Sequence, residues 1–196
     1  MSRIEFYYDF RSPYSYFATC RMHLLAEKGA EISWRPSNVD VLLNLQQGRE
    51  PAAEVLDPLC APKRAHFMAD IFRMIEYWKI PFAMPSPVVP TCHQAMAVAA
   101  LLEQAGSEGE KFRDALFRAV WQEQKDASDP AVIRACMEAG GVEAELLGRA
   151  EKEGMELLTR NTVAAFDRGV FGVPTFVIGE ELYFGADRME LLAARL

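Results

Sequence analysis

The stretch that decides the fold runs from residue 9 to residue 16 and reads Asp9-Phe10-Arg11-Ser12-Pro13-Tyr14-Ser15-Tyr16. It follows the apolar and aromatic run 4–8, which predicts a buried strand. Pro13 predicts the first turn of a helix, where the missing N–H costs nothing and φ is already helical. Ser12 is then the N-cap. A strand that runs straight into a helix start predicts an electropositive pocket suited to an anion. On these residues alone, a Ser12 that only caps the helix is the simpler interpretation.

Composition narrows the class of protein. The chain has 196 residues, of which 51% are hydrophobic, so it can bury a core as one domain or as two intimate ones. The formal net charge is −7 and there is no basic run, which disfavours nucleic acid as a partner. The first residues lack a charged segment followed by an apolar one, and no long uncharged apolar run occurs elsewhere. We therefore expect neither secretion nor a membrane span, and a cytoplasmic protein.

The thiols and imidazoles give no metal or disulfide pattern. The four cysteines are far apart and form no C-x-x-C motif: Cys20, Cys60, Cys92 and Cys136. Structural thiols in a reducing compartment are the simplest explanation. The three histidines show no metal-ligand spacing to one another or to the cysteines: His23, His66 and His93. We therefore predict no metal site.

The opening of the chain predicts strand, helix and strand. Apolar residues recur at helical spacing over 13–29, and Gly29 ends that helix sensibly. Residues 31–35 alternate as a strand should, with Ile32 and Trp34 on one side. The length of the crossover suits parallel neighbours.

The middle of the chain predicts helices joined by irregular segments. Residues 37–62 are expected to be irregular, because Gly48, Pro51 and Pro62 interrupt any long element. A helix is expected over 63–79, followed by a connector over 80–90 that holds four prolines. Further helices are expected over residues 91–105, 108–124, 130–140, 143–153 and 156–169.

The last thirty residues again predict strands and a helix, as the first residues of the chain do. Residues 170–178 predict a turn into a strand, with Pro174 at the strand's mouth because proline cannot donate to a sheet. A tight turn, a strand at 182–184 and a final helix at 188–195 follow. The pattern predicts an α/β fold, in which a thioredoxin-like domain formed by 1–37 and 168–196 is interrupted by an all-helical insertion domain at 38–167.

Four motifs in this order make the chain resemble a known family. They are Tyr8-Asp9-Phe10-Arg11-Ser12-Pro13-Tyr14-Ser15-Tyr16, Trp34-Arg35-Pro36, Phe171-Gly172-Val173-Pro174-Thr175 and Phe184-Gly185-Ala186-Asp187-Arg188. The chain resembles the 2-hydroxychromene-2-carboxylate isomerases and the kappa-class glutathione transferases, which share their architecture with periplasmic disulfide oxidoreductases. The resemblance covers nearly the whole chain and is specific at both ends but loose in the middle.

The resemblance implies that glutathione binds to the thioredoxin-like domain and that Ser12 is catalytic. Ser12 and Ser15 occupy the two positions where the redox relatives carry the cysteines of C-x-x-C. Because neither is a thiol, dithiol exchange through this site is chemically impossible. In this context Ser12 is expected to do more than cap a helix.

Other positions match the motifs of the resembled family to different degrees. Val173 matches the residue before the family's cis-proline, so we expect a cis Val173–Pro174 bond and backbone pairing with the cysteinyl part of glutathione. Asp187 matches the residue that holds the γ-glutamyl end, and it also suits the N-cap of the last helix. Transferases of the family often carry a serine before that aspartate, where this chain has Ala186.

Two basic residues are further candidates. Arg49 lies in a loop where the transferases often have an asparagine, and it could meet a carboxylate of glutathione or of the substrate. Lys63 is similarly placed, although a solvated surface lysine is the simpler interpretation.

The resemblance implies glutathione-dependent isomerisation of 2-hydroxychromene-2-carboxylate, or a related aromatic-catabolite acid, to the trans-o-hydroxybenzylidenepyruvate form. The alternatives are a kappa-like transferase or peroxidase using the same thiolate, and a non-catalytic binding module. A homodimer is expected because dimers are usual in the resembled family.

Overall fold

The strands of both chain ends share one sheet. The structure, a computed structural model, describes residues 2–56, 59–107 and 109–196. Its sheet has the order β2-β1-β3-β4, formed by β1 (Arg3–Tyr8), β2 (Glu31–Pro36), β3 (Thr175–Ile178) and β4 (Glu181–Phe184). β1 pairs with β2 in parallel, whereas β3 is antiparallel to both β1 and β4. The predicted joining of the two ends in a single sheet is confirmed.

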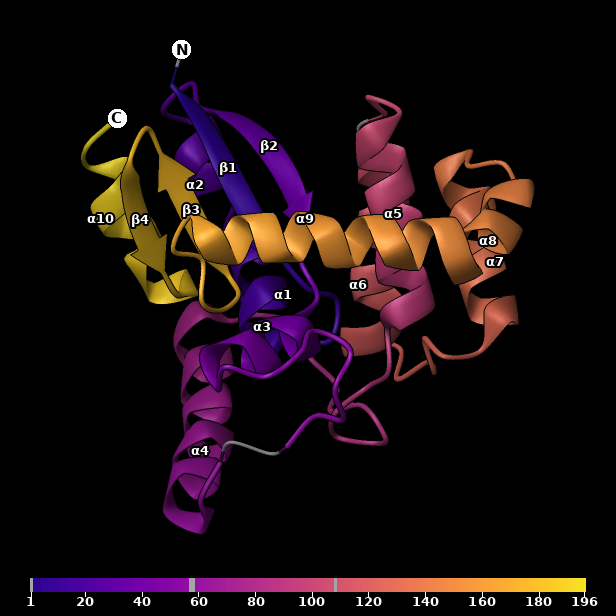
Figure 1. The fold of residues 1–196 in the computed structure, drawn as a ribbon. Coiled ribbons are helices and arrows are strands. Elements are labelled where there is room, and N and C mark those ends of the chain that lie inside the picture. Colours follow the sequence, from indigo (N-terminus) through magenta and orange to yellow (C-terminus); the bar gives the residue numbers. More distant parts are fainter. Residues whose placement is uncertain (1, 57–58, 108) are drawn as a thin grey trace.

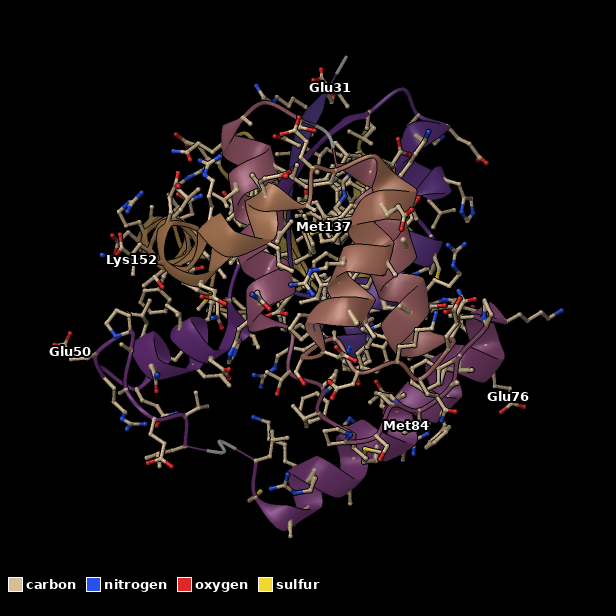
Figure 2. The ribbon with its side chains drawn as sticks, turned by 90° about the vertical axis from the view of Figure 1, so that its right-hand side faces the viewer. Glu31, Glu50, Glu76, Met84, Met137 and Lys152 are labelled. Atoms are coloured by element: carbon tan, nitrogen blue, oxygen red, sulfur yellow. The ribbon has the colours of Figure 1, made fainter. Side chains whose placement is uncertain are left out.

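Helices occupy most of the rest of the described chain. They are α1 (Pro13–Cys20), α2 (His23–Ala26), α3 (Val39–Gln46), α4 (Ala61–Trp78), α5 (His93–Gln104), α6 (Glu110–Trp121), α7 (Pro130–Gly140), α8 (Glu145–Arg149), α9 (Met155–Asp167) and α10 (Met189–Ala193). Figure 1 shows α5 to α8 on one side of the sheet, α9 running across it, and α4 extending away below. In the turned view of Figure 2, the exposed side chains of Glu31, Glu50 and Glu76 point outward, whereas the buried Met137 lies among the helices.

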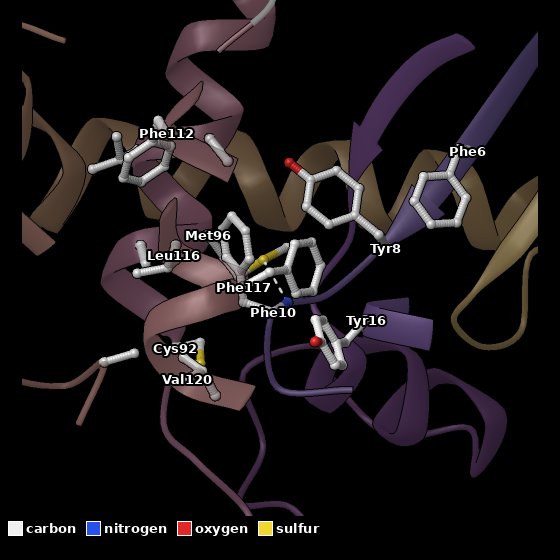
Figure 3. Close-up of a cluster of buried hydrophobic side chains, with 14 of the residues drawn as sticks. Phe6, Tyr8, Phe10, Tyr16, Cys92, Met96, Phe112, Leu116, Phe117 and Val120 are labelled. Carbon is white, nitrogen blue, oxygen red and sulfur yellow. Dashed lines mark hydrogen bonds between the residues drawn. The ribbon is translucent and has the colours of Figure 1, made fainter. Parts of the chain in front are cut away.

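The two faces of the sheet are covered by different helices. On one face, Phe6 and Tyr8 of β1 join the main core with residues of α1, α5 and α6. Figure 3 shows part of this core, in which the aromatic rings gather around Phe10. On the other face, Tyr7 packs in a smaller cluster with Leu42 of α3 and Ala165 of α9. This alternation follows from the strand's period of two, which sends successive side chains to opposite faces.

The second face depends on helices from the middle of the chain. Both α3 and α9 fall within residues 38–167, and both pack onto the sheet. The division into an interrupted domain and an insertion at 37/38 and 167/168 stays a prediction. Among the described residues, no helix is both long enough and apolar enough to cross a membrane.

The expected helix over 13–29 is wrong, because the chain forms two helices there. α1 ends at Cys20 and α2 begins at His23. Between them, Arg21 turns its buried side chain toward the end of the chain, where Nη1 donates to the Ala186 carbonyl at 2.7 Å. Its guanidinium carbon also lies 3.9 Å from the centre of the Trp78 ring. These tertiary contacts interrupt the helix between α1 and α2, whereas the helical pattern of the sequence alone predicts one continuous helix.

The expectation of an irregular segment over 37–62 is also wrong at its start. Asn38 caps α3, since its side chain accepts from the Asp40 N–H at 2.9 Å. Asn38 and the apolar residues that follow it indicate a helix start. The glycine and prolines later in the segment favour irregular structure and conceal this local pattern. By contrast, the predicted pair Asp129-Pro130 does begin α7, with Asp129 accepting from the Ala131 N–H at 2.8 Å.

The other helices agree with the predictions in position. α4, α5 and α6 begin and end within a few residues of the expected bounds, and residue 108, the expected start of α6, lies outside the described residues. The two segments expected over 143–153 and 156–169 are joined by a π-helical turn at Ala150–Gly154. A Cβ on Gly154 would lie 2.9 Å from the Ala97 carbonyl oxygen, so glycine allows this turn to pack closely against α5.

Candidate functional site

The sheet register brings three separate loops to one edge. Tyr7, near the end of β1, pairs with Thr175 at the start of β3. Thr175 in turn pairs with Phe184 at the end of β4. The segments that continue from these strand ends therefore lie at the same edge: 9–12 after β1, 172–174 before β3 and 185–187 after β4. Ser12, Val173, Pro174, Ala186 and Asp187 belong to these segments.

Ser12 is the N-cap of α1, as predicted. Its Oγ accepts a hydrogen bond from the Ser15 N–H at 3.2 Å, and its backbone is extended. Because the hydroxyl acts here as an acceptor, its own O–H remains able to donate to another group. Ser15 is fully buried, and its Oγ accepts from the Asp9 N–H at 3.4 Å. The two serines of the motif therefore have different environments.

The Val173–Pro174 peptide bond is cis, which confirms the prediction. The Pro174 carbonyl accepts from the Gly185 N–H at 2.9 Å, so this loop is tied to the turn after β4. A second hydrogen bond stabilises the loop, in which Thr175 Oγ1 donates to the Gly172 carbonyl at 2.7 Å. Among the described residues, the backbone of Val173 takes part in no backbone–backbone hydrogen bond. Its N–H and C=O are therefore left for another partner.

Asp187 does not cap the last helix, contrary to one of its two expected roles. A 3₁₀ turn at Ala186–Arg188 precedes α10, and neither has a side-chain cap. The carboxylate is 52% exposed and lies 3.7 Å from Arg188 Nη1. A Cβ on Gly185 would collide with Asp187 Oδ1, and Gly185 has φ of 106°, so glycine is required in this turn. Ala186 is buried.

Arg49 and Lys63 lie in the middle of the chain, away from these loops in sequence. Arg49 follows α3, and its Nη1 donates to the Asn44 Oδ1 at 3.2 Å. Lys63 is exposed in the first turn of α4, with Nζ 6.0 Å from the centre of the Phe67 ring. Within the described residues, no hydrogen bond or ion pair joins either side chain to Ser12, Val173 or Asp187. Their proposed contacts to glutathione or substrate stay predictions.

A polar cluster beside Ser12 was missed by the sequence reasoning. Asp9 is 1% exposed, and its carboxylate accepts from the Arg11 N–H at 3.0 Å and from the Val39 N–H at 2.9 Å. Arg11 Nη1 lies 2.5 Å from Asp40 Oδ1, and His93 Nε2 lies 2.7 Å from Asp40 Oδ2. Asp9 and Arg11 stand inside the quoted motif, but their partners are distant in sequence, so no local signal pairs them.

The charges in this cluster shift one another's ionisation. Burial raises the pKa of Asp9 above its usual range, and Arg11 and the two backbone N–H groups offset only part of the effect. Burial also acts to raise the pKa of Asp40, but the hydrogen bond from His93 and the charge of Arg11 outweigh it and lower that pKa. The same hydrogen bond raises the pKa of His93, against a smaller opposing effect of burial. The pair favours an ionised carboxylate beside a protonated imidazole.

The cavity beside β2 is lined by other residues than those of the predicted site. A cavity of about 490 Å³ opens between β2 and the helices α5 and α6, lined among others by Trp34, Arg35 and Arg113. Ser12, Val173 and Asp187 do not line it. The Arg113 guanidinium carbon lies 4.0 Å from the centre of the Trp34 ring. At the predicted site Ser12 is half-buried and Asp187 is exposed, whereas the side chain of Val173 is buried.

The sequence as a whole defines the class of protein. The family model of the DSBA-like thioredoxin domain matches residues 3–196, and the chain belongs to this family. Among curated proteins, the chain is 27% identical over 196 residues to 2-hydroxychromene-2-carboxylate isomerase of Sphingobium xenophagum, which covers 98% of this chain and 97% of the relative. It is 28% identical over 209 residues to glutathione S-transferase kappa 1 of Homo sapiens, with 97% of this chain and 88% of the relative covered.

Solved structures show the same fold. A structure of 2-hydroxychromene-2-carboxylate isomerase superposes with a TM-score of 0.78 at 24% identity, covering 98% of this chain and 93% of the other. The cytosolic disulfide reductase DsbM of Pseudomonas aeruginosa with GSH superposes with a TM-score of 0.62 at 14% identity, covering 98% of both chains. The fold is therefore the thioredoxin-like DsbA fold, as the sequence predicts.

Proposed function

We propose that this protein is a glutathione-dependent isomerase that converts 2-hydroxychromene-2-carboxylate, or a related aromatic acid, to the trans-o-hydroxybenzylidenepyruvate form. The observation that carries the proposal is Ser12, a hydroxyl at a helix start beside a cis-proline loop in a chain that lacks both thiols of the redox motif. The full-length similarity to proteins named as such isomerases supports it.

The residues at this edge fit glutathione in three places. The unpaired backbone of Val173 suits the cysteinyl residue of the tripeptide, because an extended peptide pairs with a free backbone edge. The exposed carboxylate of Asp187 suits the α-amino group of the γ-glutamyl residue. The Ser12 hydroxyl suits the sulfur. Arg49 and Lys63 are proposed for the remaining carboxylates.

When bound, glutathione supplies a thiolate that adds reversibly to a conjugated double bond and so permits rotation about it. The task of the chain is to favour the thiolate at neutral pH, against a reference thiol pKa of about 8.5. A hydrogen bond from the Ser12 hydroxyl to a charged group contributes roughly 1.5–3 kcal/mol. The start of α1 adds about 0.3–1 kcal/mol. Since one pKa unit corresponds to about 1.4 kcal/mol, Ser12 and the helix together lower the thiol pKa by about one to three units, of which Ser12 supplies about one to two.

A kappa-like transferase or peroxidase is the second candidate. The similarity to glutathione S-transferase kappa 1 favours it, and the same Ser12 would serve both reactions. Ala186, which is buried and has no hydroxyl, counts modestly against it, because the resembled transferases often have a serine there. The homodimer expected from the resemblance stays a prediction, which sedimentation would test.

Glutathione binding and isomerisation are tested together. Reduced glutathione at a hundredfold excess over its dissociation constant should stabilise the native protein by roughly 2.7 kcal/mol, because it binds only the folded state. Isomerisation of the chromene acid, followed by absorbance, should require glutathione. The proposal fails if millimolar glutathione leaves the melting temperature unchanged and its removal leaves isomerisation unchanged. Stabilisation by glutathione with turnover of electrophiles or peroxides but not of the acid would favour the transferase.

A further inference from the structure

Three helices begin beside the loop that carries Ser12. α1 begins at Pro13, α3 begins at Val39, whose N–H donates to Asp9, and α5 begins at His93. The contact between the Phe10 N–H and Met96 Sδ, 3.4 Å long, fixes the first turn of α5 against this loop. Figure 3 shows Met96 next to Phe10, with a dashed line for this contact. His93 is therefore held next to the loop of the proposed site, although it lies far from Ser12 in sequence.

Asp40 fixes the orientation of the His93 ring. One carboxylate oxygen of Asp40 contacts Arg11 and the other contacts His93 Nε2, at 2.5 and 2.7 Å. Asp40 and Arg11 are 15% and 18% exposed, whereas His93 is 43% exposed. Among the described residues, His93 Nδ1 has no hydrogen bond. The ring thus has one nitrogen held by a carboxylate and the other open to a ligand, which is the arrangement of an oriented proton donor and acceptor.

The charges around His93 favour its protonated form. The groups that face it are Asp40 on α3, Arg11 on the loop before α1 and, further away, Asp9. The two carboxylates raise the pKa of His93 and Arg11 opposes them, with the hydrogen bond to Asp40 the largest effect. The raised pKa keeps the His93 ring protonated, so the ring can first release a proton to a ligand and then accept one.

The proposed substrate needs such a group. 2-Hydroxychromene-2-carboxylate is a cyclic hemiketal, so its ring must open before the side-chain double bond can rotate. In that step the hemiketal O–H loses a proton and becomes a carbonyl, while the bond from C2 to the ring oxygen breaks and the resulting phenolate takes up a proton. The step moves one proton between two oxygens and needs no oxidant or reductant. Ser12, which serves the thiolate, does not supply this transfer.

We propose that His93, oriented by Asp40, is a catalytic residue whose imidazolium delivers a proton to the ring oxygen as the bond to C2 breaks and then takes up the hemiketal proton. The inference rests on the proposed function and adds a second catalytic group to it. Arg11 is then a positioning residue, because it holds Asp40 from the other side. The competing interpretation is that the three side chains only fasten α3 and α5 to the loop, in which case His93 would affect stability but not the chemistry.

The test compares His93→Gln with His23→Gln, an exposed histidine on α2. In His93→Gln, kcat should fall by about 10²–10⁴-fold, the range for a lost general acid–base group, and the pH–rate profile should lose the limb due to His93. The stabilisation by glutathione should stay as in the wild type, and added imidazole should restore part of kcat. His23→Gln should match the wild type in every measurement.

A second variant tests the role of Asp40 without any substrate. In glutathione-free protein, Asp40→Asn should lower the pKa of His93, followed by NMR, because a neutral amide no longer stabilises the imidazolium. An unchanged His93 pKa would overturn the proposed orientation by Asp40. If the wild type isomerises the acid and His93→Gln keeps its kcat and pH profile, the His93 inference alone is wrong. Parallel loss of kcat and of glutathione stabilisation would show a structural role and overturn it as well. A wild type that does not isomerise the acid would refute the proposed function, and this inference with it.

Discussion

The loop at residues 9–12 has one side in the aromatic core and one side at the proposed site, and the two sides are built differently. Phe10 is fully buried, with its ring centre 4.8 Å from that of Phe117, and its carbonyl accepts from Trp121 Nε1 at 2.8 Å. Arg11 and Ser12, the next two residues, are only half-buried and are held by polar contacts. Packing fixes one side of the loop and hydrogen bonding fixes the other.

This difference separates stability from function within a few residues. Removing a ring from the core leaves a cavity, so the free energy of unfolding falls. Removing a hydroxyl or a carboxylate from the exposed side loses few packing contacts, so the effect should appear in ligand binding and turnover. The following substitutions test that separation.

Phe10→Ala should have the largest effect on folding. The lost ring should lower the free energy of unfolding by about 3–5 kcal/mol, because the rings around it cannot close the cavity fully. The matched control is Phe72→Ala on α4, where the ring is 55% exposed and the change should stay within about 0.5 kcal/mol. Urea unfolding of both variants measures the comparison. Equal losses in the two would mean that Phe10 does not anchor the loop through packing.

Ser12→Ala should have a smaller effect on folding and a large one on the bound thiol. Loss of the N-cap should lower the free energy of unfolding by about 1 kcal/mol. The pKa of glutathione's thiol in the complex, followed by thiolate absorbance, should rise by about one to two units, because the charge-assisted hydrogen bond is gone. Turnover at neutral pH should fall and should partly recover at alkaline pH, where glutathione ionises unaided.

The same variant separates the two roles of Ser12. If Ser12 only caps α1, stability drops but the thiol pKa in the complex does not move. Ser15→Ala is a useful comparison, since Ser15 is fully buried and accepts from the Asp9 N–H. It should affect stability without a direct effect on the thiol. If Ser12→Ala keeps the wild-type pKa of the bound thiol and full turnover, the proposed role of Ser12 in stabilising the thiolate is refuted.

Asp187→Asn should change folding least. Its carboxylate is exposed and caps no helix, so the free energy of unfolding should change by no more than about 0.5 kcal/mol. Glutathione should bind about ten- to hundredfold more weakly, because a hydrogen bond between charged groups is worth roughly 1.5–3 kcal/mol. Asp167→Asn, at the exposed end of α9, is the control and should leave binding unchanged. Unchanged affinity in both variants would remove Asp187 from the proposed site.

Local signals predicted most of the elements. The pair Ser12-Pro13 gave the start of α1, and Asp129-Pro130 gave the start of α7. Local signals failed where a distant contact decides the outcome. The break after Cys20 depends on the buried Arg21, whose main partners are Ala186 and Glu190 near the far end of the chain.

The candidate site shows the same division. The motifs singled out Ser12, Pro174 with its cis bond, and Asp187, and the sheet register brings their three loops to one edge, although Asp187 does not cap the last helix as one expectation had it. Asp40 and His93 escaped prediction, since each looks ordinary in its own segment. No spacing in the sequence relates His93 to Asp40, so the pair has no local signature.

The sequence by itself determined where α1 and α7 begin, which strands are buried and that positions 12 and 15 carry no thiol. These are properties of neighbouring residues, set by backbone geometry, capping and periodicity. The tertiary structure alone decided that Asp9 receives the Val39 N–H and that Asp40 lies between Arg11 and His93. Such contacts join segments that the sheet register and helix packing bring together. Burial then changes the ionisation of these groups, and burial is a property of the folded chain.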